Sequence, residues 1–423
     1  MKSHPSSYDP YAGNMLIKGL GPILSPEEAR RKLVDLPARP PSDIGSIPRH
    51  IRLHMLQDLR RLHLPSLEGI QTHQTMDLMI RQNYKHTDPT LPSTWTLKGG
   101  EASQIWKRSG SPAFGAAVEG ISGAGKTEAI TRALHLFPRI IEHESFPKIA
   151  GAHTQVTWIS TDVPPGGKPR DLAVALMSAW MRTTGSDRFE DSLQRKSPRS
   201  GMAMLEEWRQ VASSHFLGFL HLDEVQNFFK LSPLEVRRRV KSRDATQELS
   251  VQEDQSLRWL LNLMNVWQIP LLVSGTPDGI GALTKRLSTT ERFVTSGFHA
   301  FKHFADPLST AFKNTFLAPL STYQYVATPL QITDDVATLI VEKTAGVQRL
   351  IIALWVAAHR VAFERKDDDL RIEDFEVAAD TLLSPIGPAV IALRSNNPLM
   401  MARYEDLTAR DQTFWQNFWS KRP

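Results

Sequence analysis

The sequence GISGAGKT at residues 120–127 has the residue types and spacing of a loop that binds nucleotide phosphates. Its glycines let backbone N–H groups turn inward onto phosphate oxygens, and a helix that starts at the end of the loop favours bound anions. Lys126 can reach the β- and γ-phosphate oxygens, and Thr127 can coordinate Mg²⁺. We therefore expect the nucleotide to contact Gly120, Ile121, Ser122, Gly123, Ala124, Gly125, Lys126, Thr127 and Glu128.

A second element, FLGFLHLDE at residues 216–224, is an apolar run that ends in two carboxylates. Asp223 is expected near the magnesium ion, and Glu224 is placed to polarise the water that attacks the γ-phosphate. A kinase of small metabolites needs no glutamate to activate water, whereas a hydrolase does. The acidic pair therefore favours an ATPase, with Lys126 and Glu224 as catalytic residues, over a phosphotransferase.

Two further motifs supply polar groups that could sense the γ-phosphate. In VSGTP, Ser274 or Thr276 would follow a strand, although a Gly- and Pro-containing turn is also an ordinary way to end one. In TAGVQRL, Arg349 stands at the start of a helix and could reach the phosphates, or it could be a solvated helix residue. Both motifs are expected to add ligands to the nucleotide.

The elements that position these residues follow from the hydrophobic pattern. Short apolar runs at residues 113–119, 154–161, 216–222 and 268–275 are separated by stretches with helical periodicity. Buried strands that alternate with helices predict an α/β domain built on a parallel sheet. The phosphate loop falls at a strand-to-helix junction, where the chemistry requires it, because TEAITRALHLF continues the loop as an amphipathic helix.

The same pattern predicts four regions along the chain. Residues 1–24 are expected to be a flexible tail, and residues 25–112 a helical region that binds partners. That region begins at SPEEARRKL, where Ser25 caps a helix that starts at Pro26. Residues 113–325 form the nucleotide-binding core, and residues 326–423 a helical lid with a partner-binding tail.

Composition excludes several classes of protein. The chain has 423 residues and no cysteine, so neither disulfides nor thiolate metal sites are available. The first residues lack the apolar core of a secretory signal, and the longest apolar run, residues 350–358, is about half a membrane span. We expect a cytoplasmic protein with no membrane partner. The net charge of +5 is compatible with a nucleic-acid partner but does not establish one.

The order of phosphate loop, acidic strand, polar sensor and helical lid resembles an AAA+ ATPase. More closely, the chain resembles the transposition-regulator ATPases of the TnsC/TniB type, found in Tn-seven-like and CRISPR-associated transposons. The stretches that carry this resemblance are MIRQNYKHTDP (79–89), STDVPPGGKPRDL (160–172), LDEVQNF (222–228), VWQIPLLVSGTP (266–277) and ALRSNNPLMMARYEDL (392–407).

The resemblance implies a bacterial protein with a P-loop AAA+ core, which binds ATP and Mg²⁺ and hydrolyses the ATP. It implies assembly into a ring or helical filament on double-stranded DNA. There the protein would link a target-selection adaptor of the TniQ or TnsD kind to transposase subunits of the TnsA and TnsB kind. Lys168 and Arg170 would contact the DNA backbone without reading sequence. The basic cluster EVRRRVKSR at residues 235–243 is a second DNA contact or a solvated helix face.

The chain departs from this family in one motif. Related proteins often carry paired arginines before a Ser-Gly, whereas TERFVTSG contains Arg292 alone. We assign Arg292 as the arginine finger that completes a neighbouring subunit's site, with Arg286 as a second candidate.

Several alternatives stay open at the level of sequence. The chain could be an AAA+ or signalling ATPase that acts on protein partners without DNA. Target choice could fall to a sequence-specific DNA-binding protein or to an RNA-guided complex. The number of subunits and the roles of residues 180–206 and of the C-terminal tail are not assigned.

Overall fold

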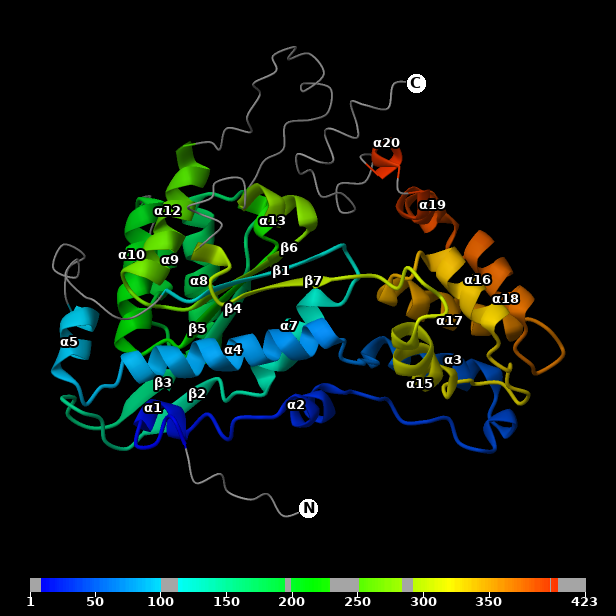
Figure 1. The fold of residues 1–423 in the computed structure, drawn as a ribbon, viewed down its shortest axis with the longest axis horizontal. Coiled ribbons are helices and arrows are strands. Elements are labelled where there is room, and N and C mark those ends of the chain that lie inside the picture. The colour runs from blue at the N-terminus through cyan, green and yellow to red at the C-terminus, as the bar shows by residue number, and fades with distance from the viewer. Residues whose placement is uncertain are drawn as a thin grey trace, which may run out of the picture. The chain divides into compact units, whose positions relative to one another are not determined.

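The computed structural model describes residues 9–99, 113–194, 199–228, 251–283, 292–395 and 397–401. Two compact units make up the chain, and each combines segments that are distant in sequence (Figure 1). The first unit contains Met1–Pro26, Gln71–Glu119 and Ile130–His299, and the second contains Glu27–Ile70, Gly120–Ala129 and Ala300–Pro423.

Within the described residues, five strands of the main sheet follow the order β4-β5-β6-β1-β7. Strand β1 pairs in parallel with β6, β6 with β5, and β5 with β4, which confirms the predicted parallel sheet. The order differs from the order in the chain, so the connections cross over the sheet. The bounds of the strands are β1 Gly115–Gly120, β4 Trp158–Asp162, β5 Phe219–Asp223, β6 Leu271–Gly275 and β7 Gly297–Phe301.

The first unit is built on this sheet, and every residue of β5 and β6 is buried. Burial on both faces explains their almost continuous apolar sequence. Helices α8 (Pro169–Thr184), α10 (Gly201–Ser214) and α12 (Val251–Asn265) lie side by side (Figure 1). Their apolar faces bury large side chains such as Trp180 and Trp208 in one core with the strands.

The remaining elements of the first unit lie before, between and after these helices in the chain. They include a two-stranded antiparallel sheet, β2 (Ile140–His143) with β3 (His153–Val156), which the sequence did not predict. The apolar run at residues 154–161 is therefore two strands in two different sheets. The helices are α1 Met15–Lys18, α4 Leu67–His86, α5 Pro92–Gly99, α7 Lys126–His135, α9 Glu190–Gln194, η3 Val225–Phe228 and α13 Pro277–Leu283, of which α4 and α7 continue from segments of the second unit.

Residues 9–24 do not form the flexible tail that we expected. Leu16 and Ile17 of α1 are buried, with 0% and 5% of their surface exposed. Asn14 Nδ2 donates a 2.9 Å hydrogen bond to the carbonyl of Tyr84, and Gln155 Nε2 donates a 3.0 Å bond to the carbonyl of Leu16. The apolar pair in a short polar segment therefore stabilises this part of the chain against the first unit.

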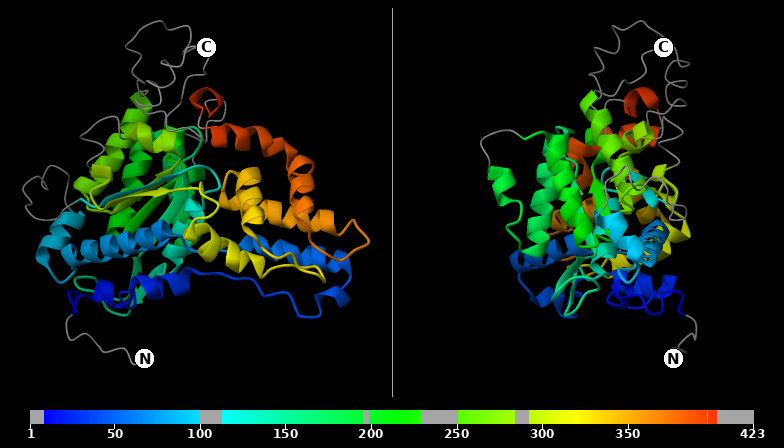
Figure 2. Two further views of the ribbon diagram at one scale, coloured as in Figure 1. Left: turned by 45° about the vertical axis from the view of Figure 1, so that its right-hand side comes forward. Right: turned by 90° about the vertical axis from the view of Figure 1, so that its left-hand side faces the viewer.

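The second unit is mostly helical. Helices α16 (Asp334–Thr344), α17 (Gln348–Ala362) and α18 (Ile372–Asp380), in yellow to orange in Figure 2, contact one another. Their shared core includes Leu354, Trp355 and Phe375. The other elements are α2 Pro26–Leu33, η1 Ile44–Ser46, α3 Arg49–Met55, η2 Leu56–Arg61, η4 Ala311–Leu317, α15 Ala318–Ser321, η5 Ser384–Ile386, α19 Gly387–Ser395 and α20 Pro398–Met401.

The two units divide the chain differently from the regions expected from sequence. Residues 27–70 belong to the second unit and residues 71–99 to the first, so residues 25–112 are not one region. The second unit resumes at Ala300, before the expected boundary at residue 326. An ion pair joins residues 27–70 to the C-terminal part of the second unit. Arg52 of α3 binds Asp368 through two hydrogen bonds of 2.9 and 2.8 Å. The Arg52 side chain is 3% exposed, so this contact is part of the unit's interior.

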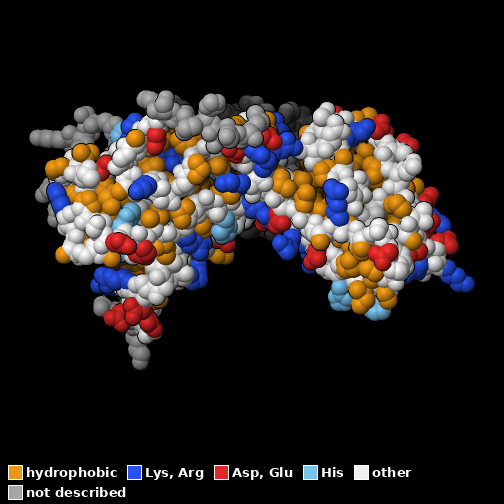
Figure 3. Space-filling view, turned by 90° about the horizontal axis from the view of Figure 1, so that it is seen from below, with side chains coloured by type: hydrophobic (Ala, Val, Ile, Leu, Met, Phe, Trp, Pro, Cys, Tyr) orange, Lys and Arg blue, Asp and Glu red, His pale blue; other side chains and the backbone are white. Residues whose placement is uncertain are grey.

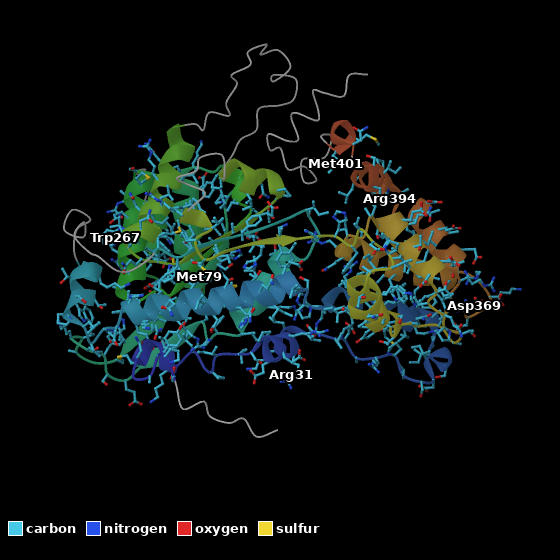
Figure 4. All side chains as sticks on the ribbon, viewed as in Figure 1. Arg31, Met79, Trp267, Asp369, Arg394 and Met401 are labelled. Carbon is cyan, nitrogen blue, oxygen red and sulfur yellow. The ribbon has the colours of Figure 1, made fainter. Side chains whose placement is uncertain are left out.

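The turn between α17 and α18 is held by charged side chains. Asp369, labelled in Figure 4, lies in this turn. It accepts hydrogen bonds from Arg365 at 2.9 Å and from Arg371 at 2.6 Å. These bonds to two guanidinium groups hold the pKa of the Asp369 carboxyl below its usual range.

Across the described residues no single helix is long and apolar enough to cross a membrane. One helix pair, Ile372–Asp380 with Ser384–Ser395, is bent by 70° and meets that test by length and composition.

Candidate active site

The phosphate loop lies between β1 and α7, as predicted, and its residues belong to the second unit. Gly123 and Gly125 have φ angles of +83° and +90°, which glycine adopts without the strain that a Cβ would bring. Lys126, the first residue of α7, is 8% exposed. Its Nζ donates hydrogen bonds of 2.6 and 3.2 Å to the carbonyls of Gly120 and Ile121. A buried ammonium group over a glycine turn at a helix N-terminus fits the phosphates of a nucleotide.

Arg349 is near this loop because the first turn of α17 packs on it. The backbone N–H of Arg349 donates a 3.3 Å hydrogen bond to the carbonyl of Gly123. A Cβ atom added to Gly123 would lie 3.1 Å from Val347 and 3.2 Å from the Arg349 side chain. The Arg349 side chain itself is exposed. The structure therefore brings together two predicted site elements that are more than 200 residues apart in the chain.

The acidic pair belongs to the first unit. Asp223 ends β5 and is 3% exposed, whereas the Glu224 side chain is exposed. Glu224 has a φ of +56°, a left-handed conformation that is uncommon outside glycine and is often found at functional sites. Its backbone N–H donates a 2.9 Å hydrogen bond to Asp223 Oδ1, which supports this turn. The turn directs two successive carboxylates to different environments.

Gln226 connects Glu224 to the end of β6. Its Nε2 donates a hydrogen bond to Glu224 Oε2, and its Oε1 accepts a 3.2 Å bond from the backbone N–H of Thr276. Thr276 also directly precedes α13, where its Oγ1 accepts a 3.4 Å bond from the N–H of Gly279. Of the two sensor candidates, Thr276 thus has a helix-capping role in this arrangement.

Ser274, the other sensor candidate, lies beside the acidic pair in a buried polar network. Its Oγ donates a 2.6 Å hydrogen bond to Asp223 Oδ1 and lies 2.8 Å from His221 Nε2. His221 Nδ1 lies 2.8 Å from the Oγ of Ser160 on β4. Burial lowers the pKa of His221 to about 4, although the nearby Asp223 charge acts in the opposite direction. The imidazole is therefore neutral at pH 7.

Asp162 is the register partner of Asp223 on the neighbouring strand β4. Its pKa is raised, by desolvation first and by the charge of Asp223 second. Two carboxylates on adjacent strand ends repel each other, and a divalent cation relieves such repulsion. Carboxylate and hydroxyl oxygens are ligands that Mg²⁺ accepts, so the donor types at this strand end fit that ion.

The other predicted residues lie at different places. Lys168 and Arg170 are exposed at the start of α8. Arg292 is exposed, and its carbonyl lies beside Gly115, at the end of β1 opposite to the one that leads into the phosphate loop. Thr127 and Glu128 are exposed in the first turn of α7. Arg286, the basic cluster at residues 235–243 and the C-terminal tail lie outside the described residues.

Sequence reasoning missed Ser160, His221 and Gln226. A signal for His221 was present in FLHLD, where His221 and Asp223 are two residues apart and thus share one face of a strand. A polar residue at that position of an apolar strand requires a partner, because an unpaired buried polar group is costly. The partner strands could not be identified without the sheet order.

One family model and several solved structures are similar to this chain. Residues 113–283 match the family model described as an AAA domain. Solved structures of similar fold include the Aeropyrum pernix ORC1 protein in complex with DNA, at 16% identity and a TM-score of 0.41, covering 76% of this chain and 74% of that chain. Another is Drosophila ORC bound to DNA, at 13% identity and a TM-score of 0.37, covering 78% and 71%. No curated protein matches the sequence.

The parallel sheet, the phosphate loop after β1 and the acidic pair after β5 define an α/β P-loop domain of the AAA+ class. Residues 113–283 therefore carry the nucleotide-hydrolysing type of domain, in agreement with the ATPase predicted from the sequence. At the identities and TM-scores given, the solved structures bear on neither its activity nor its partners.

Proposed function

We propose that this protein is an ATP-dependent regulator of DNA transposition that assembles on duplex DNA and links a target-selection protein to a transposase. In this proposal Lys126 and the loop N–H groups bind the ATP phosphates, and Thr127 and Asp223 hold Mg²⁺. The ion, when bound, neutralises charge that develops on the phosphates. Glu224 accepts the proton of the attacking water, and Arg292 of a neighbouring subunit stabilises the transition state.

One contact carries the proposal. The loop at residues 163–168, which ends in Lys168, lies against the segment that follows Asp223 and Glu224, and both are in the first unit. The N–H of Val163 donates a 2.8 Å hydrogen bond to the carbonyl of Asp223, and Asn227 Nδ2 donates a 2.7 Å bond to the carbonyl of Val163. A Cβ on Gly167 would lie 2.5 Å from the Asn227 carbonyl. Lys168 follows directly, so a movement of the turn at Glu224 would reach the basic side chains.

This arrangement suits a timer on DNA. Lys168 and Arg170 can bind phosphates of a duplex, and the state of the nucleotide can change their position through residues 163–167. On the face shown in Figure 3, Lys and Arg side chains are scattered among hydrophobic and polar ones. Contacts of this kind bind the DNA backbone and depend on salt, not on sequence. Adaptor and transposase binding rest on the family resemblance of the sequence alone.

The test is duplex binding measured by fluorescence anisotropy at several salt concentrations, with ATP, with a non-hydrolysed analogue and without nucleotide. Binding should need nucleotide and should vary little between random sequences. Lys168→Ala with Arg170→Ala should weaken it and reduce the slope of log affinity against log salt by about 2. The matched control is Lys18→Ala with Lys85→Ala, two exposed lysines of the same unit, which should change the slope little. If ATP-loaded protein ignores duplex DNA at low salt, an ATPase that acts on protein partners becomes the better assignment.

A further inference from the structure

We propose that His221 is a positioning residue that fixes the direction of the hydrogen bond from Ser274 to Asp223, and thereby orients the carboxylate beside the catalytic base. The proposal rests on the nucleotide-hydrolysing function proposed above, because it concerns the same acidic pair. It assigns a role to a residue that contacts neither nucleotide nor water in the mechanism.

The network crosses three adjacent strands of the first unit. Ser160 lies on β4, His221 and Asp223 on β5, and Ser274 on β6. His221 is 1% exposed and Ser274 is 0% exposed, so water does not compete for the bond between them, whereas Ser160 is partly exposed. The successive distances are 2.8 Å from Ser160 Oγ to His221 Nδ1, 2.8 Å from His221 Nε2 to Ser274 Oγ, and 2.6 Å from Ser274 Oγ to Asp223 Oδ1.

The hydrogen-bonding groups fix the direction of the bonds between His221 and Asp223. An ionised carboxylate can only accept, so Ser274 uses its single O–H to donate to Asp223. Ser274 must then accept from His221, which places an imidazole proton on Nε2. Ser160 Oγ contacts the other ring nitrogen, Nδ1, and so holds the opposite edge of the ring.

This direction has two consequences at the acidic pair. Asp223 Oδ1 accepts from Ser274 and also from the N–H of Glu224, so the orientation of the Asp223 carboxylate is coupled to the left-handed turn at Glu224. In addition, the Ser274 proton is committed to Asp223 and is not available to a phosphate. Ser274 therefore acts on the proposed magnesium ligand, and its role as a γ-phosphate sensor stays a prediction from the sequence.

The first test measures the proton position without any enzyme activity. Protein labelled with ¹⁵N-histidine is examined by long-range ¹H–¹⁵N NMR at pH 7, and His221 is assigned by the signal that disappears in His221→Gln. We expect a proton on Nε2. A ring whose Nε2 carries no proton would overturn the proposal. If His221→Gln does not fold, Ser160→Ala provides the assignment, because only the ring that loses this partner should shift.

The second test measures Mg²⁺ dependence. Ser160→Ala leaves the acidic pair intact but removes the hydroxyl that holds His221 Nδ1 and so fixes the position of the ring. We expect it to raise the Mg²⁺ concentration for half-maximal ATP hydrolysis by about 10-fold, as loss of a partner behind a metal ligand commonly does. Nucleotide binding without Mg²⁺ should not change. Thr161→Ala, on the same strand but the opposite face, is the matched control. An unchanged Mg²⁺ requirement in a stably folded Ser160→Ala variant contradicts the proposal.

The outcomes separate the two proposals. Wild-type protein that shows the Nε2–H ring but no ATP hydrolysis would count against the proposed function and leave the network in place. Wild-type protein that hydrolyses ATP with the opposite tautomer would overturn the role of His221 alone.

Discussion

The backbone N–H of Arg349 donates a 3.3 Å hydrogen bond to the carbonyl of Gly123, so the start of α17 lies against the turn of the phosphate loop. Two residues with left-handed conformations, Ala345 and Gly346, precede this helix. Helix α17 and the phosphate loop are thus joined by a main-chain hydrogen bond, so changes in the turn before α17 should affect the loop.

Gly346→Ala tests this turn. Gly346 has a φ of +69°, and a Cβ there would lie 1.9 Å from the carbonyl oxygen of Phe304. We expect a loss of about 2 kcal/mol or more in the free energy of unfolding, because both strain and a backbone clash oppose the substitution. Denaturant titration measures it. Gly387→Ala, in α19 with open space around the site, is the control and should cost little. Equal stability of the two variants would contradict the described turn.

Lys126→Ala should abolish ATP binding. The Lys126 ammonium lies over the carbonyls of Gly120 and Ile121, in the position from which it would reach the phosphates. Titration with a fluorescent ATP analogue measures the loss, and Lys168→Ala, at an exposed lysine, serves as the control. Unchanged affinity in Lys126→Ala would remove this lysine from the site.

Glu224→Gln should still bind ATP but hydrolyse it about 100-fold or more slowly, because the amide cannot accept a proton from water. Glutamine has the same size as glutamate and keeps one acceptor oxygen, so it can still accept the hydrogen bond that Glu224 accepts from Gln226. Phosphate release under single-turnover conditions separates the chemical step from product release. A hydrolysis rate equal to that of wild type would exclude Glu224 as the base.

Arg292→Ala tests whether subunits complete each other's sites. Arg292 is exposed, and its carbonyl lies beside Gly115, at the end of β1 opposite to the one that leads into the phosphate loop. In wild-type protein, hydrolysis per subunit should rise with protein concentration, and the variant should lose most of that increase while still binding ATP. Activity per subunit that is constant from dilute to concentrated wild-type protein would indicate a self-sufficient monomer.

His359 should make the stability of the second unit depend on pH. It is fully buried in α17, where its Nδ1 bonds to the carbonyl of Trp355, and burial lowers its pKa to about 4. The unfolded chain has the ordinary value of about 6.5, so it binds more protons between these values. Stability from this group is complete above pH 6.5 and falls by up to about 3 kcal/mol as the pH decreases toward 4.

The measurement is the free energy of unfolding of wild type and His359→Gln across that pH range. Wild type should lose more stability on acidification than the variant, and the buried Asp374 carboxylate reduces the difference because it favours the charged imidazole. Parallel curves would contradict a buried neutral His359.

The sequence by itself determined the local elements that carry the chemistry. A glycine-rich turn with Lys126 at a helix start and an apolar strand that ends at Asp223 are encoded within about ten residues each. Local backbone preferences and hydrophobic periodicity are sufficient for such elements, and the parallel sheet follows from their alternation.

Only the tertiary structure decided which distant residues share a surface. Strand order brings Ser160 and Ser274 to the two sides of His221, and helix packing brings Arg349 to Gly123. Packing within the first unit buries Leu16 and Ile17, in a segment that looks like a tail when read alone. These contacts depend on the burial of side chains from several elements at once, a free energy that no single stretch of sequence contains.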